Sequence, residues 1–279
     1  MGKSSNVDSR DIYYRLSKSE GYRARSAYKL LHIAEEFDIF PHDLRNAVDL
    51  CAAPGSWSQV LVKKLNEVPN QMPAKIVAVD LQPMAPLEGV VQITGDITSP
   101  KTAAEVISAM DGEKAQLVIC DGAPDVTGLH TLDSHLQAQL LLAAFSISVH
   151  LLAPGGTFIA KIFRTPQDPG AEWLVSQLRS FFPETDRKNR ETKMGGVWVR
   201  KPRSSREGSG EAFIICRNFT PLPGLMTDCN SRPGTSLLDI FRSVSLSDPI
   251  SNPIEQSDTR EAEKVEKMAL GWTGGGDLS

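Results

Sequence analysis

The stretch Val48–Trp57 reads V-D-L-C-A-A-P-G-S-W and constrains the fold more than any other part of the chain. It starts as a short apolar run, which is typical of a buried strand, and passes into small residues and a Pro-Gly pair. An amphipathic helical segment follows, with Ser56 as its expected N-cap. Strand, tight turn and helix form the arrangement of a nucleotide-type cofactor site, because small residues admit a ligand to the backbone. The motif differs from the dinucleotide fingerprint G-x-G-x-x-G, and taken alone it also fits a plain tight turn.

Strand and helix patterns alternate along most of the chain. Apolar runs of strand length lie at Ala47–Cys51, Ile76–Leu81, Val90–Ile93, Leu117–Cys120, Thr157–Phe163 and Ala212–Cys216, with a shorter one at Val197–Val199. Helical patterns lie at Ser56–Leu65, Thr102–Met110, Ser134–Leu152 and Glu172–Phe182. Runs such as I-V-A-V-D-L are apolar on both faces, as expected for strands covered by helices on each side. The pattern predicts an α/β fold with a doubly wound, mostly parallel sheet.

The two ends of the chain differ from this middle part. Residues 8–40 carry an interrupted helical pattern in which tyrosines alternate with Arg10, Arg15, Lys18, Arg23, Arg25 and Lys29. Such a pattern fits either a solvated helical face or a surface for single-stranded RNA. We therefore expect a basic N-terminal helical segment over residues 1–40 and a main domain over residues 41–219. Residues 220–279 are rich in Pro, Gly, Ser and acidic residues, which predicts a tail that is disordered or bound to a partner.

The composition argues against several classes of protein. No apolar run reaches the ~18 residues of a membrane span, and the N-terminus lacks the apolar core of a signal peptide, so no membrane contact is expected. The four cysteines form no C-x-x-C pair and three lie in apolar runs, which favours buried thiols in a reducing, cytoplasmic compartment. No metal-ligand cluster appears, so no metal is expected. The net charge of −4 does not indicate nucleic-acid binding for the chain as a whole.

Three carboxylates follow or end expected strands. They are Asp80 in V-A-V-D-L, Asp96 in T-G-D-I-T and Asp121 in V-I-C-D-G-A-P. In doubly wound sheets a ligand binds outside the carboxyl ends of the strands, and an acid after the second strand suits the ribose of an adenosine. One aspartate after a strand is usually a turn or helix cap. Three of them beside the Pro-Gly turn favour a ligand site.

Two further charged residues lie in apolar strands. Lys161 sits inside F-I-A-K-I-F, where it either faces a cleft or protects an edge strand from aggregation. Glu211 begins the strand E-A-F-I-I-C and also fits a simple strand-end acid.

Several long motifs, in order, resemble the FtsJ/RrmJ family of AdoMet-dependent RNA 2′-O-methyltransferases. They are R-A-R-S-A-Y-K-L, V-D-L-C-A-A-P-G-S-W-S-Q-V-L, D-G-A-P-D-V-T-G-L-H, A-K-I-F and K-P-R-S-S-R, and the resemblance covers about residues 11–219. The third and fifth motifs resemble the eukaryotic branch that acts on the tRNA anticodon loop. The bacterial branch acts on large-subunit ribosomal RNA.

The resemblance implies a fold and a set of site residues. The fold is a Rossmann-like, seven-stranded sheet with helices on both faces and an antiparallel last strand. The family's K-D-K-E tetrad falls on Lys29, Asp121, Lys161 and Glu211. Its S-adenosyl-L-methionine contacts fall on Gly55, Trp57, Asp80, Asp96 and Asp121. The basic N-terminal segment is expected to contact the RNA backbone through Arg23, Arg25 and Lys29.

The chain departs from the family pattern in three places. The family's G-R-D after K-I-F-R is replaced by T-P-Q-D-P, residues near 184–199 look inserted, and the C-terminal tail is shorter. The first and last bear on the substrate-facing loop and on partner docking. In the anticodon-loop branch, the family implies separate partner subunits, one of them built of WD repeats, that direct methylation to nucleotide 32 or the wobble nucleotide 34.

Together the motifs predict methyl transfer from S-adenosyl-L-methionine to a ribose 2′-hydroxyl of tRNA, at position 32, position 34 or both. Lys161 is the expected base, Asp121 orients it, and Lys29 and Glu211 complete the polar cluster. Ribosomal RNA is the alternative substrate. A non-catalytic RNA-binding subunit with this fold is the alternative of another class, although the complete tetrad argues against it. A nicotinamide-dependent dehydrogenase is disfavoured because G-x-G-x-x-G is missing.

Overall fold

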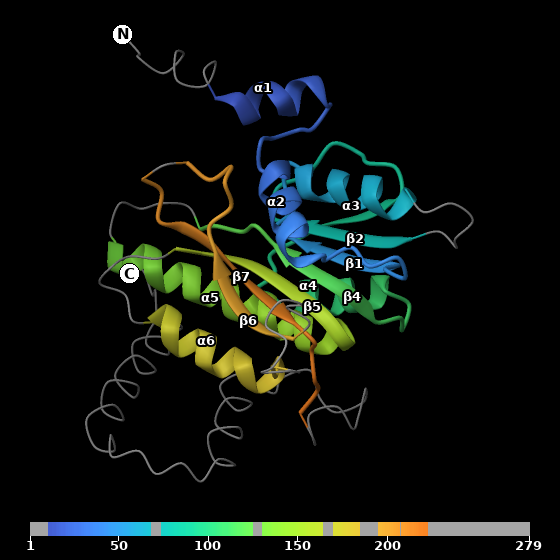
Figure 1. Cartoon of the computed structure of the whole chain (residues 1–279). Helices are drawn as coiled ribbons and strands as arrows, with labels where there is room; N and C mark the ends of the chain where they lie inside the picture. Colours follow the sequence, from blue (N-terminus) through green and yellow to red (C-terminus); the bar gives the residue numbers. More distant parts are fainter. Residues whose placement is uncertain are drawn as a thin grey trace, which may run out of the picture. The chain divides into compact units, whose positions relative to one another are not determined.

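A seven-stranded sheet organises the chain in the computed structural model (Figure 1). The structure describes residues 11–67, 74–124, 130–163, 170–184, 195–206 and 208–222, which belong to one structural unit. The strands are β1 (Asn46–Leu50), β2 (Lys75–Asp80), β3 (Val90–Thr94), β4 (Ala115–Cys120), β5 (Leu152–Phe163), β6 (Gly196–Arg200) and β7 (Glu211–Arg217). The tail expected over residues 220–279 lies outside the described residues, except for its first three positions.

The strand order is β3-β2-β1-β4-β5-β7-β6. The strands from β3 to β5 are parallel, whereas β7 is antiparallel to both β5 and β6. This confirms the predicted mostly parallel, Rossmann-like sheet with an antiparallel last strand. The strand order reverses direction along the chain between β1 and β4, and this is the place where doubly wound sheets bind ligands.

Six helices of the described residues accompany the sheet: α1 (Ile12–Ser19), α2 (Ala27–Phe37), α3 (Ser56–Asn66), α4 (Pro100–Ala109), α5 (His130–Leu151) and α6 (Gly170–Phe181). Neighbouring residues of β5 show how they divide between the two faces. Ile159 joins the core cluster under α2 and α3, while Phe158 contacts Phe145 of α5, which in turn contacts Phe181 of α6. Successive side chains of a strand point to opposite faces, so both faces are apolar and both are covered.

The N-terminal segment is helical over its described residues, as its interrupted pattern predicts, but the helix is broken in the middle. Asp11 caps α1 by accepting a hydrogen bond from the main-chain N–H of Tyr13 at 3.0 Å. The chain then turns at Gly21 before α2 begins. The φ of Gly21 is +76°, a conformation that glycine adopts with little steric cost. The segment therefore forms two helices joined by a turn.

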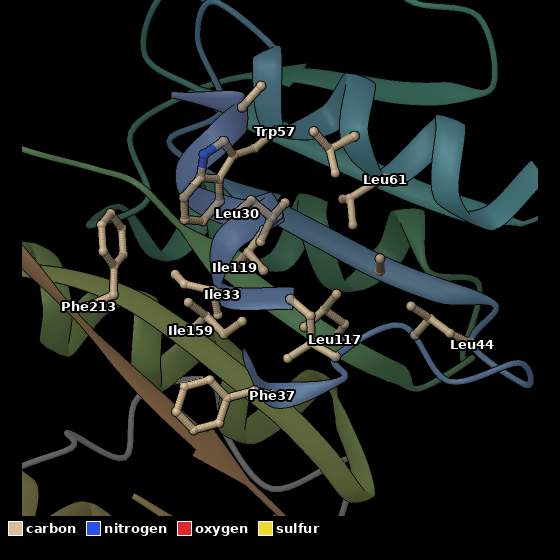
Figure 2. Close-up of a cluster of buried hydrophobic side chains, with 14 of the residues drawn as sticks. Leu30, Ile33, Phe37, Leu44, Trp57, Leu61, Leu117, Ile119, Ile159 and Phe213 are labelled. Carbon is tan, nitrogen blue, oxygen red and sulfur yellow. The ribbon is translucent and has the colours of Figure 1, made fainter. Parts of the chain in front are cut away.

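The helix α2 lies before the predicted domain boundary at residue 40, and it packs into the main core. Leu30, Ile33 and Phe37 of α2 pack with Trp57 of α3 and with Ile159 of β5 (Figure 2). All five side chains are almost completely excluded from water. The burial of such side chains stabilises the fold by roughly 1.5–3 kcal/mol each, so α2 and the sheet form one hydrophobic unit.

Residues near 184–199 were expected to form an insertion, and their last part is a strand of the main sheet. This strand is β6, which pairs with β7 over the whole length of β6, from Gly196 opposite Arg217 to Arg200 opposite Phe213. The strand prediction at Val197–Val199 is thus confirmed, and these residues are integral to the sheet. Residues 185–194 lie outside the described part of the chain. None of the helices described here is both long and apolar enough to cross a membrane.

Candidate active site

The four predicted tetrad residues meet at one edge of the sheet although they come from distant parts of the chain. Lys161 Nζ lies 3.1 Å from Asp121 Oδ1 and donates a hydrogen bond to the main-chain carbonyl of Asp121 at 2.6 Å. Lys29 Nζ donates to Glu211 Oε2 at 2.6 Å and lies 3.9 Å from Asp121 Oδ2. Asp121 therefore stands between the two ammonium groups.

Strand register explains why these side chains meet. Cys120, at the end of β4, pairs with Ala160 of β5, so Asp121 follows directly beside Lys161. Glu211 begins β7, which runs antiparallel to β5 and therefore starts where β5 ends. Because Lys161 pairs with Phe213, and Glu211 lies two positions before Phe213, both charged side chains share one face of the sheet.

The tetrad is nearly dry, with side-chain exposures between 10% and 17%. Burial raises the pKa of Asp121 above its usual value, and the charges of Lys161 and Lys29 oppose this rise without cancelling it. For Glu211 burial is the largest effect and acts to raise the pKa, but the hydrogen bonds from Lys29 and Ser205 and the charges of Lys29 and Lys161 together lower it. Two cations and two carboxylates offset one another, which permits their burial.

A loop that the sequence reading left out of the site also contacts the tetrad. Ser205, in K-P-R-S-S-R, donates from Oγ to Glu211 Oε1 at 2.8 Å. Its neighbour Ser204 is 3.1 Å from His32 Nδ1 of α2 through its Oγ. Gln137 of α5 donates to the main-chain carbonyl of Lys161 at 2.9 Å from the other side. The motif K-P-R-S-S-R carried the signal for the serines, whereas nothing in the sequence marked Gln137.

The turn between β1 and α3 lies at the same edge of the sheet. Gly55 occupies the N-cap position with a φ of +100°, so the predicted N-cap at Ser56 is wrong. Ser56 is instead the first helical residue, and its Oγ lies 2.7 Å from Ser26 Oγ. A glycine N-cap has no side chain to bond the first N–H groups of α3, which leaves them for an anionic or polar ligand.

Asp80 joins this turn to the end of β2. Its Oδ2 accepts the main-chain N–H of Ala53 at 2.8 Å and its Oδ1 accepts that of Gln82 at 2.7 Å. Each carboxylate oxygen keeps a lone pair, so Asp80 can still accept a ribose hydroxyl. Asp96 follows β3, is exposed, and accepts hydrogen bonds from the N–H and Oγ1 of Thr98. Strand-end carboxylates, an uncapped helix N-terminus and a small-residue turn together fit an adenosine-type cofactor.

Trp57 is placed differently from the other expected cofactor contacts. Its indole is 2% exposed, donates from Nε1 to the carbonyl of Ser26 at 2.8 Å and lies 5.5 Å from the Phe213 ring (Figure 2). Only the main chain of Trp57 remains for a ligand at the first turn of α3.

The three predicted RNA contacts all have partners within the protein. Arg23 donates to two main-chain carbonyls, Arg25 is paired with Asp11 and with the Ser204 carbonyl, and Lys29 belongs to the tetrad. Their role in RNA binding stays a prediction. Tyr14, Arg15 and Lys18 on α1 are exposed, and Lys18 Nζ lies 5.8 Å from the centre of the Tyr14 ring.

A buried acid beneath the turn escaped the sequence reading. Asp49 of β1 is 1% exposed and accepts a hydrogen bond from Ser58 Oγ at 2.6 Å. Burial raises its pKa to about 7, against the opposing effect of the Ser58 hydrogen bond. No group of three or more metal-ligating side chains occurs in the described ranges. The T-P-Q-D-P and D-V-T-G-L segments lie outside them.

The chain resembles known proteins along most of its length. The model of the family described as FtsJ-like methyltransferase matches residues 22–219. A mouse protein is 46% identical over all of this chain and 75% of its own length, and a human protein is 53% identical over 82% of this chain and 63% of its own. Both are named tRNA (cytidine(32)/guanosine(34)-2′-O)-methyltransferase.

A solved structure supports the fold. It is described as a ribosomal RNA methyltransferase of Plasmodium falciparum, is 22% identical, and aligns with a TM-score of 0.58 over 72% of this chain and all of its own. At this identity the likeness concerns the fold alone. Because the family model matches well over half of the chain, this protein is a member of the FtsJ-like methyltransferase family.

Proposed function

We propose that this chain transfers a methyl group from S-adenosyl-L-methionine to a ribose 2′-hydroxyl in the tRNA anticodon loop, at positions 32 and 34. The single observation that carries the reaction class is the buried contact of Lys161 with Asp121, next to the cofactor-type turn of Gly55. The names of the mouse and human relatives support the tRNA nucleotides. The chain spans 75% of the length of the mouse relative and 63% of the length of the human one.

In this proposal the protein positions two reactants and accepts one proton. When bound, S-adenosyl-L-methionine supplies an electrophilic methyl group on a sulfonium. Lys161 would accept the proton of the ribose 2′-hydroxyl as that oxygen takes the methyl group, and Asp121 would hold Lys161 in place for this. Holding the reacting atoms in line accounts for much of the acceleration in such reactions.

Asp121 has two tasks in this mechanism. Its main-chain and side-chain oxygens fix Lys161 Nζ, which keeps the amine at one place near the strand ends. Its carboxylate also stands between Lys161 and Lys29, while burial raises its pKa against the charges of both lysines.

Lys161→Ala is the first test. Loss of a general base slows such reactions by about 10²–10⁴-fold. We expect label transfer from S-adenosyl-L-methionine to unmodified tRNA to fall by about that factor, with cofactor binding retained in calorimetry. Lys64→Ala is the matched control, because Lys64 is a more exposed lysine whose partner is Glu67 on the surface of α3.

Mapping the methylated nucleotide separates the alternatives. Label in the anticodon loop at positions 32 or 34 supports the proposal. Label in ribosomal RNA and not in tRNA would show that ribosomal RNA is the substrate. Cofactor binding without transfer to any RNA, tested with cell extract added to supply partner subunits, would favour a non-catalytic RNA-binding role.

Two parts of the proposal concern the cell. The family resemblance implies a separate WD-repeat subunit that directs the enzyme to its nucleotide, and purification of the tagged chain from its own cells would identify one. A cytoplasmic place of action follows from the tRNA substrate, and fluorescence microscopy of the tagged chain would check it.

A further inference from the structure

Arg23 lies in the turn between α1 and α2, and its side chain spans two loops. Nη1 donates to the carbonyl of Pro54 at 3.0 Å, in the turn between β1 and α3. Nη2 donates to the carbonyl of Pro86 at 2.9 Å, in the connection between β2 and β3. One guanidinium therefore ties together two loops that are distant in the sequence.

The backbone of Arg23 is itself held on α3. Its N–H donates to Gln59 Oε1 at 2.7 Å, and Gln59 Nε2 donates to the carbonyl of Gly21 at 3.0 Å. One side-chain amide thus binds the turn at two points. This fixes the position from which the Arg23 side chain reaches the loops.

The guanidinium packs directly on the glycine that begins α3. A Cβ atom built on Gly55 would lie 2.6 Å from Arg23 Nη1, which is closer than a Cβ carbon comes to a neighbouring heavy atom. The absence of a side chain at Gly55 thus makes room for Arg23. Asp80 connects the same two regions independently, through its bond to the N–H of Ala53.

We propose that Arg23 is a positioning residue of the cofactor site, which holds the β1–α3 turn and the β2–β3 connection in their binding geometry, and that it is not a phosphate contact. The inference rests on the proposed function, because the bridged loops contain Gly55 and follow Asp80. Because Arg23 already holds the two loops in place, ligand binding does not have to supply the free energy of ordering them. Removing the bridge adds that cost to binding and so lowers the affinity. Lysine is no substitute, because its single ammonium lacks the fork that reaches two separate carbonyls.

The test compares Arg23→Ala and Arg23→Lys with Arg200→Ala. Arg200 also connects two elements, through Glu36 of α2 at 2.8 Å, but contacts neither loop in the described structure. In calorimetry we expect S-adenosyl-L-methionine to bind about tenfold more weakly to Arg23→Ala, as for the loss of a charged hydrogen bond. Arg23→Lys should lie between Arg23→Ala and wild type, and Arg200→Ala should bind as wild type does. The salt dependence of tRNA binding should be the same for Arg23→Ala and wild type.

Three results would overturn the proposal. Unchanged cofactor affinity in Arg23→Ala, with a shallower salt dependence of tRNA binding by about one phosphate contact, would make Arg23 an RNA-binding residue. An equal loss of cofactor affinity in Arg200→Ala would show that both arginines affect binding only by stabilising the fold. A wild-type chain that binds no S-adenosyl-L-methionine would refute the proposed function, and this inference with it.

Discussion

Asp49 shows how the packing of a single residue changes its chemistry. An exposed aspartate is ionised at neutral pH, whereas Asp49 is enclosed in β1 and has one described hydrogen-bond donor, Ser58. Its pKa of about 7 places its titration in the physiological range. The carboxyl therefore carries little charge below that pH, and it lies under the turn that begins at Cys51.

Asp49→Asn should remove a pH dependence from the stability of the fold. In the unfolded chain Asp49 loses its proton near its ordinary pKa of 3.8, whereas in the folded chain it keeps the proton up to about pH 7. The free energy that this group contributes to folding is thus full below pH 3.8 and declines as the pH rises to about 7. A shift of this size corresponds to roughly 4 kcal/mol.

Urea unfolding of wild type and Asp49→Asn at pH 4, 6 and 8 measures this contribution. Asparagine preserves the shape and still accepts from Ser58, so the stability of the variant relative to wild type should rise with pH. A difference that stays constant from pH 4 to pH 8 would show that Asp49 is ionised in the folded state.

At the scale of elements, α2 and α3 are joined at their first turns by specific hydrogen bonds as well as by apolar packing. The Trp57 indole donates to the Ser26 carbonyl, and Ser26 Oγ meets Ser56 Oγ. The same helices carry Lys29 and the turn of Gly55. Their relative position therefore sets the distance between the tetrad and the cofactor-type turn.

Trp57→Phe keeps an aromatic ring in the core but removes the donor to Ser26. We expect the free energy of unfolding to fall by about 1–3 kcal/mol from the lost bond and the smaller ring. Urea denaturation checks this, with Lys64→Ala as a surface control that should change stability by less than about 1 kcal/mol. Stability equal to wild type in Trp57→Phe would show that the bond to Ser26 contributes nothing net.

Pattern predicts elements better than it predicts side-chain partners in this chain. Every expected strand is present, because an apolar run bounded by turns has few alternatives in an α/β fold. The helix break at Gly21 was missed, because a glycine inside a helical pattern does not reveal whether φ will be positive. The N-cap was misassigned by one residue for a similar reason, since Ser56 has a side-chain partner, Ser26, that only tertiary structure supplies.

The tetrad and Arg23 illustrate the two sides of this limit. Lys29, Asp121, Lys161 and Glu211 could be named from motif resemblance, and the structure brings them together. Arg23 was predicted as an RNA contact because its segment interleaves basic residues with tyrosines, and that role stays a prediction. Its acceptors are main-chain carbonyls 31 and 63 residues away. Every residue has such a carbonyl, so the sequence does not indicate which ones will accept a hydrogen bond.

At the scale of the whole molecule, β7 completes the sheet. Phe213, Ile214 and Ile215 are fully buried, and β7 separates β5 from β6. A chain that ends at residue 222 keeps all the described strands, whereas one that ends at residue 210 lacks β7. We expect the longer chain to unfold cooperatively in thermal circular dichroism and the shorter one to lose that transition. A cooperative transition in the 210-residue chain would show that the sheet is stable without its last strand.

The position of β7 in the sheet also determines when the sheet can be completed during synthesis on the ribosome. The strand made last enters between two strands made earlier, so β6 emerges before the neighbour with which it pairs. Lys29 is synthesised early, and its carboxylate partner Glu211 follows 182 residues later. Until Glu211 has been made, Asp121 is the one tetrad carboxylate that the nascent chain can offer to Lys29. The tetrad is therefore complete only after the ribosome has passed Glu211, when the other six described strands have already been made.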